Sequence, residues 1–418
     1  MKKDQYRNRL GSVLLLNEFI FRYYQRLGQK RENGSLVASV SLGFPVDILC
    51  AFDIVPMYPQ NHAAMYATLG QAGKILDMVE EKGYLPDICS EVKISLGTLL
   101  HDCQLSFRMP KPDCVLAATN VCRSMVKFAE TISRELNIPF HLHDMPFQIE
   151  YSHAKHAVEY VVAQFGDLIQ FLVKLTGKKL NIQKLTRCLR LSAEASAAWR
   201  DILSFGATVP APFDAMDIYR HMFPLITSRG SARTVEYYKM LRYEVIHRVE
   251  KGIGAVNDEQ YRLMWDYLPV YHKMNFFSRI LSKRKATVVS STFFYPVSGG
   301  RCQASVIEDA LFRPKAQRLV KGLASNHLAL YPNISLQQKA FMIKQLAERY
   351  HVHGIIIHCD RSCKPQSLPQ YEIKNILERD LKMPCLLIDA DSVDPRFFSE
   401  EQIVTRIEAF LERLSRNS

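Results

Sequence analysis

Long apolar stretches are missing from this sequence of 418 residues, and so are the usual features of secreted and membrane proteins. No run of 18 apolar residues occurs, which argues against a transmembrane helix. Residues 1–7 are basic, but no signal-peptide hydrophobic region follows them. Ten cysteines without secretory features predict a reducing compartment, the cytoplasm, and no disulfide framework.

Acidic residues are fewer than basic ones, 42 against 54, which gives a formal net charge of +12. This excess favours polyanionic partners such as phosphates, a nucleotide cofactor, an acidic protein or nucleic acid. The densest basic runs, residues 178–179 and 283–285, lack interleaved aromatic residues, which argues against a nucleic-acid groove. A hydrophobic content of 48% is typical of a globular protein, and the length allows two or three domains.

One sequence pattern occurs twice, at residues 113–144 and 354–389. Each copy has an apolar run, a polar turn with a cysteine, an amphipathic helical run, and an apolar run that begins at X-Pro and closes on aspartate. Short apolar runs without alternation are typical of parallel strands covered on both faces, so each copy predicts a βαβ unit. Cys122 and Cys363 then follow the carboxyl end of a strand, where open α/β sheets bind ligands. The two positions suggest a shared site.

Helical periodicity dominates between the two copies. We predict helices at residues 157–175, 182–203, 216–223, 233–251 and 258–268, then a strand at 286–293 and helices at 303–312 and 336–350. The predicted fold class is α/β, with two parallel-sheet lobes and an intervening helical domain. The expected domains are residues 1–151, 152–284 and 285–418.

Three cysteines, Cys89, Cys122 and Cys363, share a polar turn ahead of a helix. A helix N-terminus lowers the pKa of a thiol and favours the thiolate that binds metals. No Cys-x-x-Cys pair occurs, so spacing alone does not specify a metal site. Three thiolates converging between lobes could hold an iron–sulfur cluster with one iron open to substrate. The cysteines expected to be buried hydrophobes are Cys50, Cys114, Cys188, Cys302 and Cys385. The sequence does not assign Cys103 and Cys359 to either group.

Other hypotheses use the same segments. Cys122 or Cys363 could be a nucleophile with a histidine base, although the candidate histidines lie on strand-like apolar runs and are expected in the core. These histidines are His141, His143 and His358. The remaining polar candidates are the strand-end residues Asp144 and Asp389 and the turn at residues 229–231, which could contact an anion. A third alternative is a two-lobed α/β protein in which the cysteines are buried and bind no metal.

Several short segments occur in a fixed order along nearly the whole chain. They are Phe44-Pro45, Tyr58-Pro-Gln-Asn-His-Ala-Ala64, Gly83-Tyr-Leu-Pro-Asp-Ile-Cys89, Pro112-Asp113 through Asn120-Val-Cys122, Glu135-Leu-Asn-Ile-Pro139, Arg361-Ser-Cys363-Lys364 with Ser367-Leu368, and Asp394-Pro-Arg396 through Thr405-Arg-Ile407. In these segments the sequence resembles the 2-hydroxyacyl-CoA dehydratase family, which also contains the benzoyl-CoA reductase subunits.

The resemblance implies that Cys89, Cys122 and Cys363 ligate a 4Fe–4S cluster. It also implies flavodoxin-like (Rossmann-like) lobes, a homologous second subunit in a heterodimer, and an ATP-hydrolysing iron–sulfur activator that injects one electron. In the dehydratases that electron converts the acyl-CoA thioester into a ketyl radical, from which the hydroxyl group can leave. The resemblance therefore implies an oxygen-sensitive enzyme of anaerobic metabolism, with no nucleic-acid or membrane partner.

The sequence departs from the dehydratases at two places. Gln60 stands where they tend to carry glutamate, and an amide cannot act as a general base. The serine expected in the first strand-to-helix loop is matched loosely by Ser39 or Ser41. Candidate substrate-loop residues are Ser41, Gln60 and His62. Two functions follow: a dehydratase or related acyl-CoA reductase subunit, or a non-catalytic electron-relay or scaffold subunit.

Overall fold

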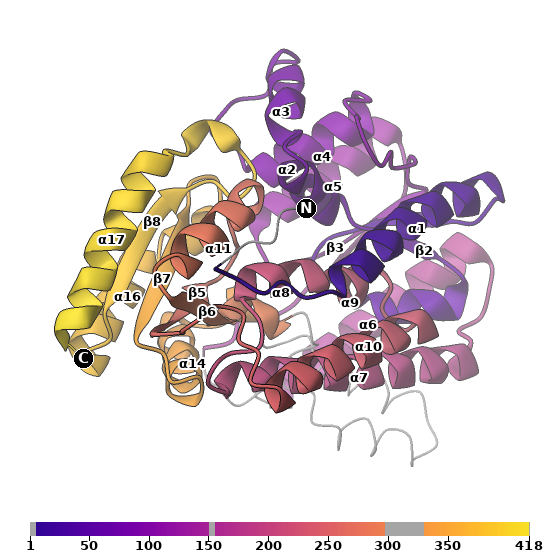
Figure 1. Cartoon of the computed structure of the whole chain (residues 1–418). Coiled ribbons are helices and arrows are strands. Elements are labelled where there is room, and N and C mark those ends of the chain that lie inside the picture. Colours follow the sequence, from indigo (N-terminus) through magenta and orange to yellow (C-terminus); the bar gives the residue numbers. More distant parts are fainter. Residues whose placement is uncertain (1–5, 150–154, 297–329, 418) are drawn as a thin grey trace.

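Two parallel four-stranded sheets form the frame of the part of the chain that the computed structural model describes, residues 6–149, 155–296 and 330–417 (Figure 1). The first sheet has the order β2-β1-β3-β4 and the second has the order β6-β5-β7-β8. The strands are β1 (Val37–Val40), β2 (Val55–Met57), β3 (Cys114–Ala118), β4 (Phe140–His143), β5 (Tyr261–Asp266), β6 (Ala286–Ser291), β7 (Gly354–Asp360) and β8 (Cys385–Ala390). The predicted α/β class is confirmed.

Helices connect and cover the strands. Those used below are α1 (Val13–Glu32), α2 (Pro59–Thr68), α3 (Ala72–Glu80), α4 (Ser90–Leu100), α5 (Arg123–Leu136), α6 (Lys155–Thr176), α7 (Ile182–Ser204), α8 (Ala215–His221), α9 (Phe223–Thr227), α10 (Ala232–Glu250), α11 (Met274–Ser282), α14 (Leu336–Arg349), α15 (Lys364–Ser367), α16 (Gln370–Leu381) and α17 (Glu400–Asn417), with the 3₁₀ helices η1 (Val46–Phe52), η3 (Tyr271–Lys273) and η7 (Pro395–Phe397). Within the described ranges no helix is long and apolar enough to cross a membrane.

The first lobe is the first sheet with its covering helices. Every residue of β1 and β3 is buried because helices pack on both faces of this sheet, which explains the continuous apolar runs. Residues such as Leu116 pack with η1, α6 and α7, whereas Val115 and Ala117 pack on the other side with α1, α4 and α5. The alternation of β3 between these two cores follows from the pleat of the strand.

The second lobe is built in the same way. Ile355 and Ile357 of β7 pack with α14 and α16, and Ile356 between them faces the core that contains α11 and α17. That last core also contains Val115 of the first sheet, so a continuous apolar interior joins the lobes. Figure 1 shows α17 along the outer side of the second sheet, with the violet first lobe beside it.

The two repeat copies are βαβ units, as predicted. The first is β3–α5–β4, and the second is β7–α16–β8 with the short helix α15 inserted after the strand. In both units the strands pair in parallel, and the cysteine of the copy lies at the start of the helix that follows the first strand.

One predicted element is wrong: residues 258–268 contain strand β5 and not a helix. This strand pairs with β6 and β7 inside the second sheet, and its apolar run is buried on both faces, a pattern that periodicity cannot distinguish from a buried helix. The predicted helix at residues 303–312 and Cys302 lie outside the described residues. The three-domain division stays a prediction.

Candidate active site

A cavity of about 310 Å³ lies at the junction of the two lobes. Its volume is at the lower end of the range for small-molecule sites. The wall is mainly apolar, and its apolar residues include Leu16, Ile20, Met65, Met125, Met222, Phe223, Ile226, Met274 and Phe293. They come from α1, α2, α5, α9, α11, the junction of α8 with α9 and the segment after β6, so the cavity depends on the packing of both lobes.

Cys89, Cys122 and Cys363 all line this cavity. Each is the residue that immediately precedes a helix: Cys89 precedes α4, Cys122 precedes α5 and Cys363 precedes α15. All three are half-buried free thiols. The first two come from the first lobe and the third from the second lobe, so the structure brings together the cysteines that the sequence singled out.

The thiol of Cys122 shows two opposing effects. Backbone N–H groups of Met125 and Ser124 at the start of α5 lower its pKa, as expected at a helix N-terminus. Burial acts in the opposite direction and is the larger effect, so the net pKa is raised. The helix N-terminus thus lowers the pKa of Cys122 as expected, but desolvation of the thiolate outweighs this effect.

Cys363 and Cys89 have pKa values raised well above the ordinary value. Burial is the main cause for both, followed by Asp360 for Cys363 and by Glu91 for Cys89. The thiols of Cys89 and Cys122 also raise the pKa of Cys363, which means that the three sulfurs influence one another. All three thiols are thus protonated at neutral pH in the protein alone, and a bound cation would be needed to deprotonate them.

Carboxyl groups stand beside these thiols. Glu91, in the first turn of α4, and Asp360, at the end of β7, both line the cavity. Burial, together with Asp360 and Asp391, raises the pKa of Glu91 to about 8. Glu91 is therefore mostly protonated at pH 7. Glu91 was not among the residues predicted for the site. Its position two residues after Cys89, at the start of a helix, is the feature of the sequence that places it beside the cysteine.

Within the described ranges, no group of three or more histidine, cysteine or acidic residues is arranged to hold a single metal ion. The ligands of one zinc ion, for example, all lie within about 2.3 Å of a common centre. Cys89, Cys122 and Cys363 therefore line one cavity without forming a site for a single metal ion.

The three substrate-loop candidates lie in different places. Gln60 of α2 lines the main cavity, with its Nε2 2.5 Å from Sδ of Met125. Ser41, just after β1, is buried, accepts a hydrogen bond of 3.0 Å from the Ala118 N–H, and lines an adjoining cavity of about 90 Å³. His62 lines neither cavity. Its Nε2 lies 2.7 Å from the carbonyl oxygen of Phe107, and burial lowers its pKa to about 4.

The histidines proposed as bases do not join the cysteines. The wall formed by described residues contains no histidine, and Nδ1 of His358 is 2.8 Å from the Leu268 carbonyl oxygen. Asp144 accepts a 2.7 Å hydrogen bond from Thr119. Asp389 pairs with Arg361 at 2.7 Å on the surface.

The other candidates also lie away from the main cavity. Arg229 pairs with Asp47 at 3.2 Å beside the smaller cavity. Cys114, Cys188 and Cys385 are buried as predicted, and Cys103 is also buried. Cys50, which was predicted to be buried, is half-buried, as is Cys359, and neither lines the main cavity.

Two parallel-sheet lobes with cysteines of both around one apolar cavity define an α/β protein with an inter-lobe site. Residues 41–414 match the family model described as 2-hydroxyglutaryl-CoA dehydratase, D-component. The chain belongs to this family, as its sequence segments indicated.

Characterised relatives extend over almost the whole chain. The (R)-2-hydroxyisocaproyl-CoA dehydratase alpha subunit of Clostridioides difficile is 28% identical over 96% of this chain and 95% of its own. The (R)-phenyllactyl-CoA dehydratase alpha subunit of Clostridium sporogenes is 29% identical over 92% of this chain and 91% of its own. A benzoyl-CoA reductase subunit of Thauera aromatica is 27% identical over 96% of this chain and 94% of its own. These relatives are subunits of enzymes, in agreement with the predicted enzyme class.

Proposed function

We propose that this protein is the iron–sulfur subunit of a 2-hydroxyacyl-CoA dehydratase-type enzyme, in which Cys89, Cys122 and Cys363 hold a 4Fe–4S cluster. The observation that carries the proposal is the convergence of these three cysteines, from two lobes, on one cavity. Both sheets have the strand order second-first-third-fourth when counted within each lobe. This order supports flavodoxin-like lobes, and such sheets bind ligands beyond the carboxyl ends of their strands.

The donor set suits a cluster better than a single ion. In a cubane each cysteine sulfur binds a different iron, so three cysteines that line one cavity suit such a group without having to meet at one point. Three cysteines leave one of four irons without a cysteine ligand, which is the arrangement that keeps a position open to substrate. When bound, such a cluster supplies single electrons for ketyl radical chemistry on an acyl-CoA thioester, with loss of a 2-hydroxyl group.

The chain supplies a surface that suits the acyl part of the substrate. Met65, Phe223 and Ile226 form part of an apolar wall that can accommodate a hydrocarbon group and exclude water. The excess of basic residues, which gives a net charge of +12, suits the phosphates of coenzyme A. The acyl-CoA thioester is the substrate class in this proposal.

Partners form part of the proposal. The relatives are named as single subunits of larger enzymes, which supports a homologous second subunit. An ATP-hydrolysing iron–sulfur activator would supply the electrons, and the complex would work in the cytoplasm under anaerobic conditions.

Gln60 favours a second candidate. Its amide lies in the cavity wall at the position where the dehydratases tend to carry glutamate, and it cannot take up a proton as a carboxylate does. The similarity to a benzoyl-CoA reductase fits a reductase-type role, or a role as electron-relay or scaffold partner. Turnover by the iron-loaded complex with its activator, with Gln60→Glu compared with the wild type, separates dehydration from these roles.

The test of the cluster is anaerobic iron and sulfide analysis with visible absorption spectra. Wild type should carry roughly four irons per chain, and each of the Cys89→Ala, Cys122→Ala and Cys363→Ala variants should lose them. Cys359→Ala is the matched control, because Cys359 precedes Cys363 by four residues on the same segment and does not line the cavity. Iron-free wild type after anaerobic reconstitution would refute the proposal.

A further inference from the structure

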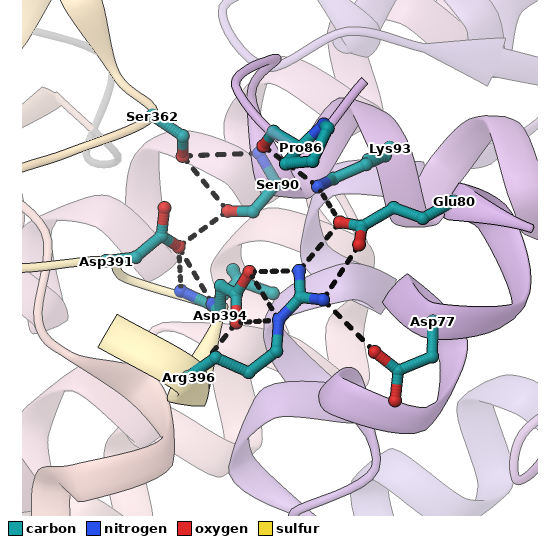
Figure 2. Close-up of polar contacts among 10 residues, drawn as sticks. Asp77, Glu80, Pro86, Ser90, Lys93, Ser362, Asp391, Asp394 and Arg396 are labelled. Carbon is teal, nitrogen blue, oxygen red and sulfur yellow. Dashed lines mark hydrogen bonds and ion pairs between the residues drawn. The ribbon is translucent and has the colours of Figure 1, made fainter. Parts of the chain in front are cut away.

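Two of the three cavity cysteines have a serine as their neighbour in the chain, and these serines meet across the lobes. Ser90 begins α4 directly after Cys89, and Ser362 directly precedes Cys363. Figure 2 shows the two serine side chains pointing toward each other, with Asp391 of the second lobe beside Ser90. The Oγ atoms of the serines are 3.1 Å apart, and the Ser90 N–H donates to Ser362 Oγ at 3.2 Å.

The hydrogen bonds have a defined direction. Ser90 Oγ is 2.6 Å from Oδ1 of Asp391, and an ionised carboxylate can only accept, so the hydroxyl proton of Ser90 goes to Asp391. Ser362 must then donate its own proton to Ser90 Oγ. The result is a chain from Ser362 through Ser90 to Asp391, in which each hydrogen bond strengthens the next. We call these three residues the serine–aspartate bridge.

Asp391 is itself held in place. Its Oδ1 also accepts the backbone N–H groups of Val393 at 2.9 Å and Asp394 at 2.8 Å, in the turn that follows β8.

A second polar contact joins the lobes beside the bridge (Figure 2). Arg396 of η7, in the second lobe, donates to Glu80 of α3, in the first lobe, at 2.7 and 2.8 Å (Figure 2). Lys93 of α4 donates to the same carboxylate at 2.5 Å. The helix that Ser90 begins is therefore tied to the second lobe at two places.

The chain before Cys89 is exposed, and one hydrogen bond of 3.0 Å, from Lys93 to the Pro86 carbonyl oxygen, ties it to α4. Leu85 is 68% exposed, and residues 85–87 all lie on the surface. Ser90, by contrast, is 2% exposed and contacts both Ser362 and Asp391. Contacts one residue away from each thiol therefore connect Cys89 and Cys363 directly across the lobes.

We infer that the serine–aspartate bridge is a positioning device, which fixes the cysteines of opposite lobes at the separation that one cluster requires. This inference rests on the proposed function for its purpose. Ser90, Ser362 and Asp391 are positioning residues: they act through Cys89 and Cys363. Partners that orient metal ligands typically contribute roughly 10- to 100-fold to metal affinity.

The experiment uses the anaerobically reconstituted, full-length protein. Ser90→Ala and Ser362→Ala should speed iron release to a chelator roughly 10-fold or more and change the electron paramagnetic resonance spectrum of the reduced cluster. Both serines belong to one chain of hydrogen bonds, so their effects should not add. The double variant should therefore release iron no faster than the faster of the two single variants. Ser362→Thr keeps the hydroxyl on a half-buried side chain and should restore wild-type behaviour.

Ser95→Ala is the matched control. Ser95 lies buried on the same helix, and its hydroxyl donates only to the Glu91 carbonyl oxygen one turn earlier, at 2.7 Å. A merely structural role for the bridge would lower the unfolding midpoint of the iron-free protein and leave the spectrum of the remaining cluster unchanged. That result, or wild-type iron release by Ser90→Ala and Ser362→Ala, would overturn the inference.

A cluster-free measurement separates this inference from the proposed function. In iron-free protein a short bifunctional thiol reagent should link Cys89 to Cys363, as detected by mass spectrometry of the joined peptides. Ser90→Ala should reduce this link several-fold, and Ser95→Ala should not. If the wild type binds no iron but forms the link, and Ser90→Ala reduces it, the proposed cluster is contradicted and the positioning role of the bridge is not. If Ser90→Ala leaves the link unchanged, the positioning role is contradicted whatever the iron content.

Discussion

The two βαβ repeats hold their cysteines at equivalent positions, but the groups around the two thiols differ. Cys122 precedes α5, a helix of 14 residues, whereas Cys363 precedes α15, a helix of four residues. The long helix offers Cys122 two N–H groups that oppose the effect of burial, whereas Cys363 faces the buried carboxyl group of Asp360. Equivalent positions in a repeated fold thus place their thiols in different electrostatic surroundings.

The repeats also differ in how they hold their cysteine. Cys122 belongs to a unit whose helix packs on its own strand through Met125, Phe128 and Ile132. Cys363 stands at the lobe junction, where Ser362 contacts Ser90, and where Glu80, Lys93 and Arg396 connect α3 and α4 to η7. The first site is held by local apolar packing and the second by polar contacts between lobes, so substitutions at the junction should have the larger effects.

The largest effect is expected at Glu80. Its carboxylate neutralises Lys93, whose side chain is 0% exposed, and it also accepts hydrogen bonds from Arg396. Glu80→Ala leaves Lys93 buried without its ion pair, which typically costs about 3–5 kcal/mol. This loss in the free energy of unfolding should lower the midpoint of urea-induced unfolding.

The control for Glu80 lies on α5, the helix of the first repeat. Glu130 of α5 pairs with Lys127 at 2.7 Å on the surface, so Glu130→Ala should cost about 1 kcal/mol or less. Equal destabilisation by the two substitutions would remove the distinction between a locally held repeat and a junction held by ion pairs.

Acid should weaken the junction in a defined pH window. Hydrogen bonds from Arg396, followed by those from Lys93, lower the pKa of Glu80 from 4.5 to about 2. The unfolded chain therefore takes up this proton more readily than the folded one. The stabilisation by Glu80 is complete above pH 4.5 and falls as the pH drops toward 2. Urea unfolding between these values should show a steeper loss of stability in the wild type than in Glu80→Ala.

A smaller effect should separate the two repeat cysteines in the metal-free protein. Burial raises the pKa of both thiols, but two backbone N–H groups oppose burial at Cys122, whereas Asp360 acts in the same direction as burial at Cys363. The thiolate fraction changes about tenfold for each unit of pKa, so at pH 8 Cys122 should react with iodoacetamide before Cys363. Asp360→Asn should narrow the difference, as followed by mass spectrometry of the alkylated peptides. The reverse order of reaction would contradict the electrostatic comparison.

The sequence predicted the repeats because buried parallel strands and the helix between them leave local patterns. It also predicted a shared site for Cys122 and Cys363, because each follows the carboxyl end of a parallel strand in its own lobe, and it singled out Cys89 by its turn ahead of a helix. It mistook β5 for a helix because a short apolar run buried on both faces has no period of its own.

Other features of the site depend on residues far apart in the chain. Gln60 and His62 are two positions apart on one helix and therefore point to different sides, so only Gln60 reaches the cavity. The contact between Ser90 and Ser362 spans 272 positions and has no signature in the sequence of either segment.

The smallest expected effect distinguishes the ends of the two repeat helices. Asn137 after α5 and Lys382 after α16 both have left-handed backbone conformations, with φ of 50° and 54°. Asparagine tolerates this region because its short side chain can bond locally, whereas lysine has no such compensation. Lys382→Gly should therefore raise the free energy of unfolding by about 0.5–1 kcal/mol, and Asn137→Gly should change it by a few tenths at most. Urea unfolding of the two variants measures this. If Asn137→Gly stabilised the protein as much as Lys382→Gly, the two helix ends would carry the same strain and would not distinguish the repeats.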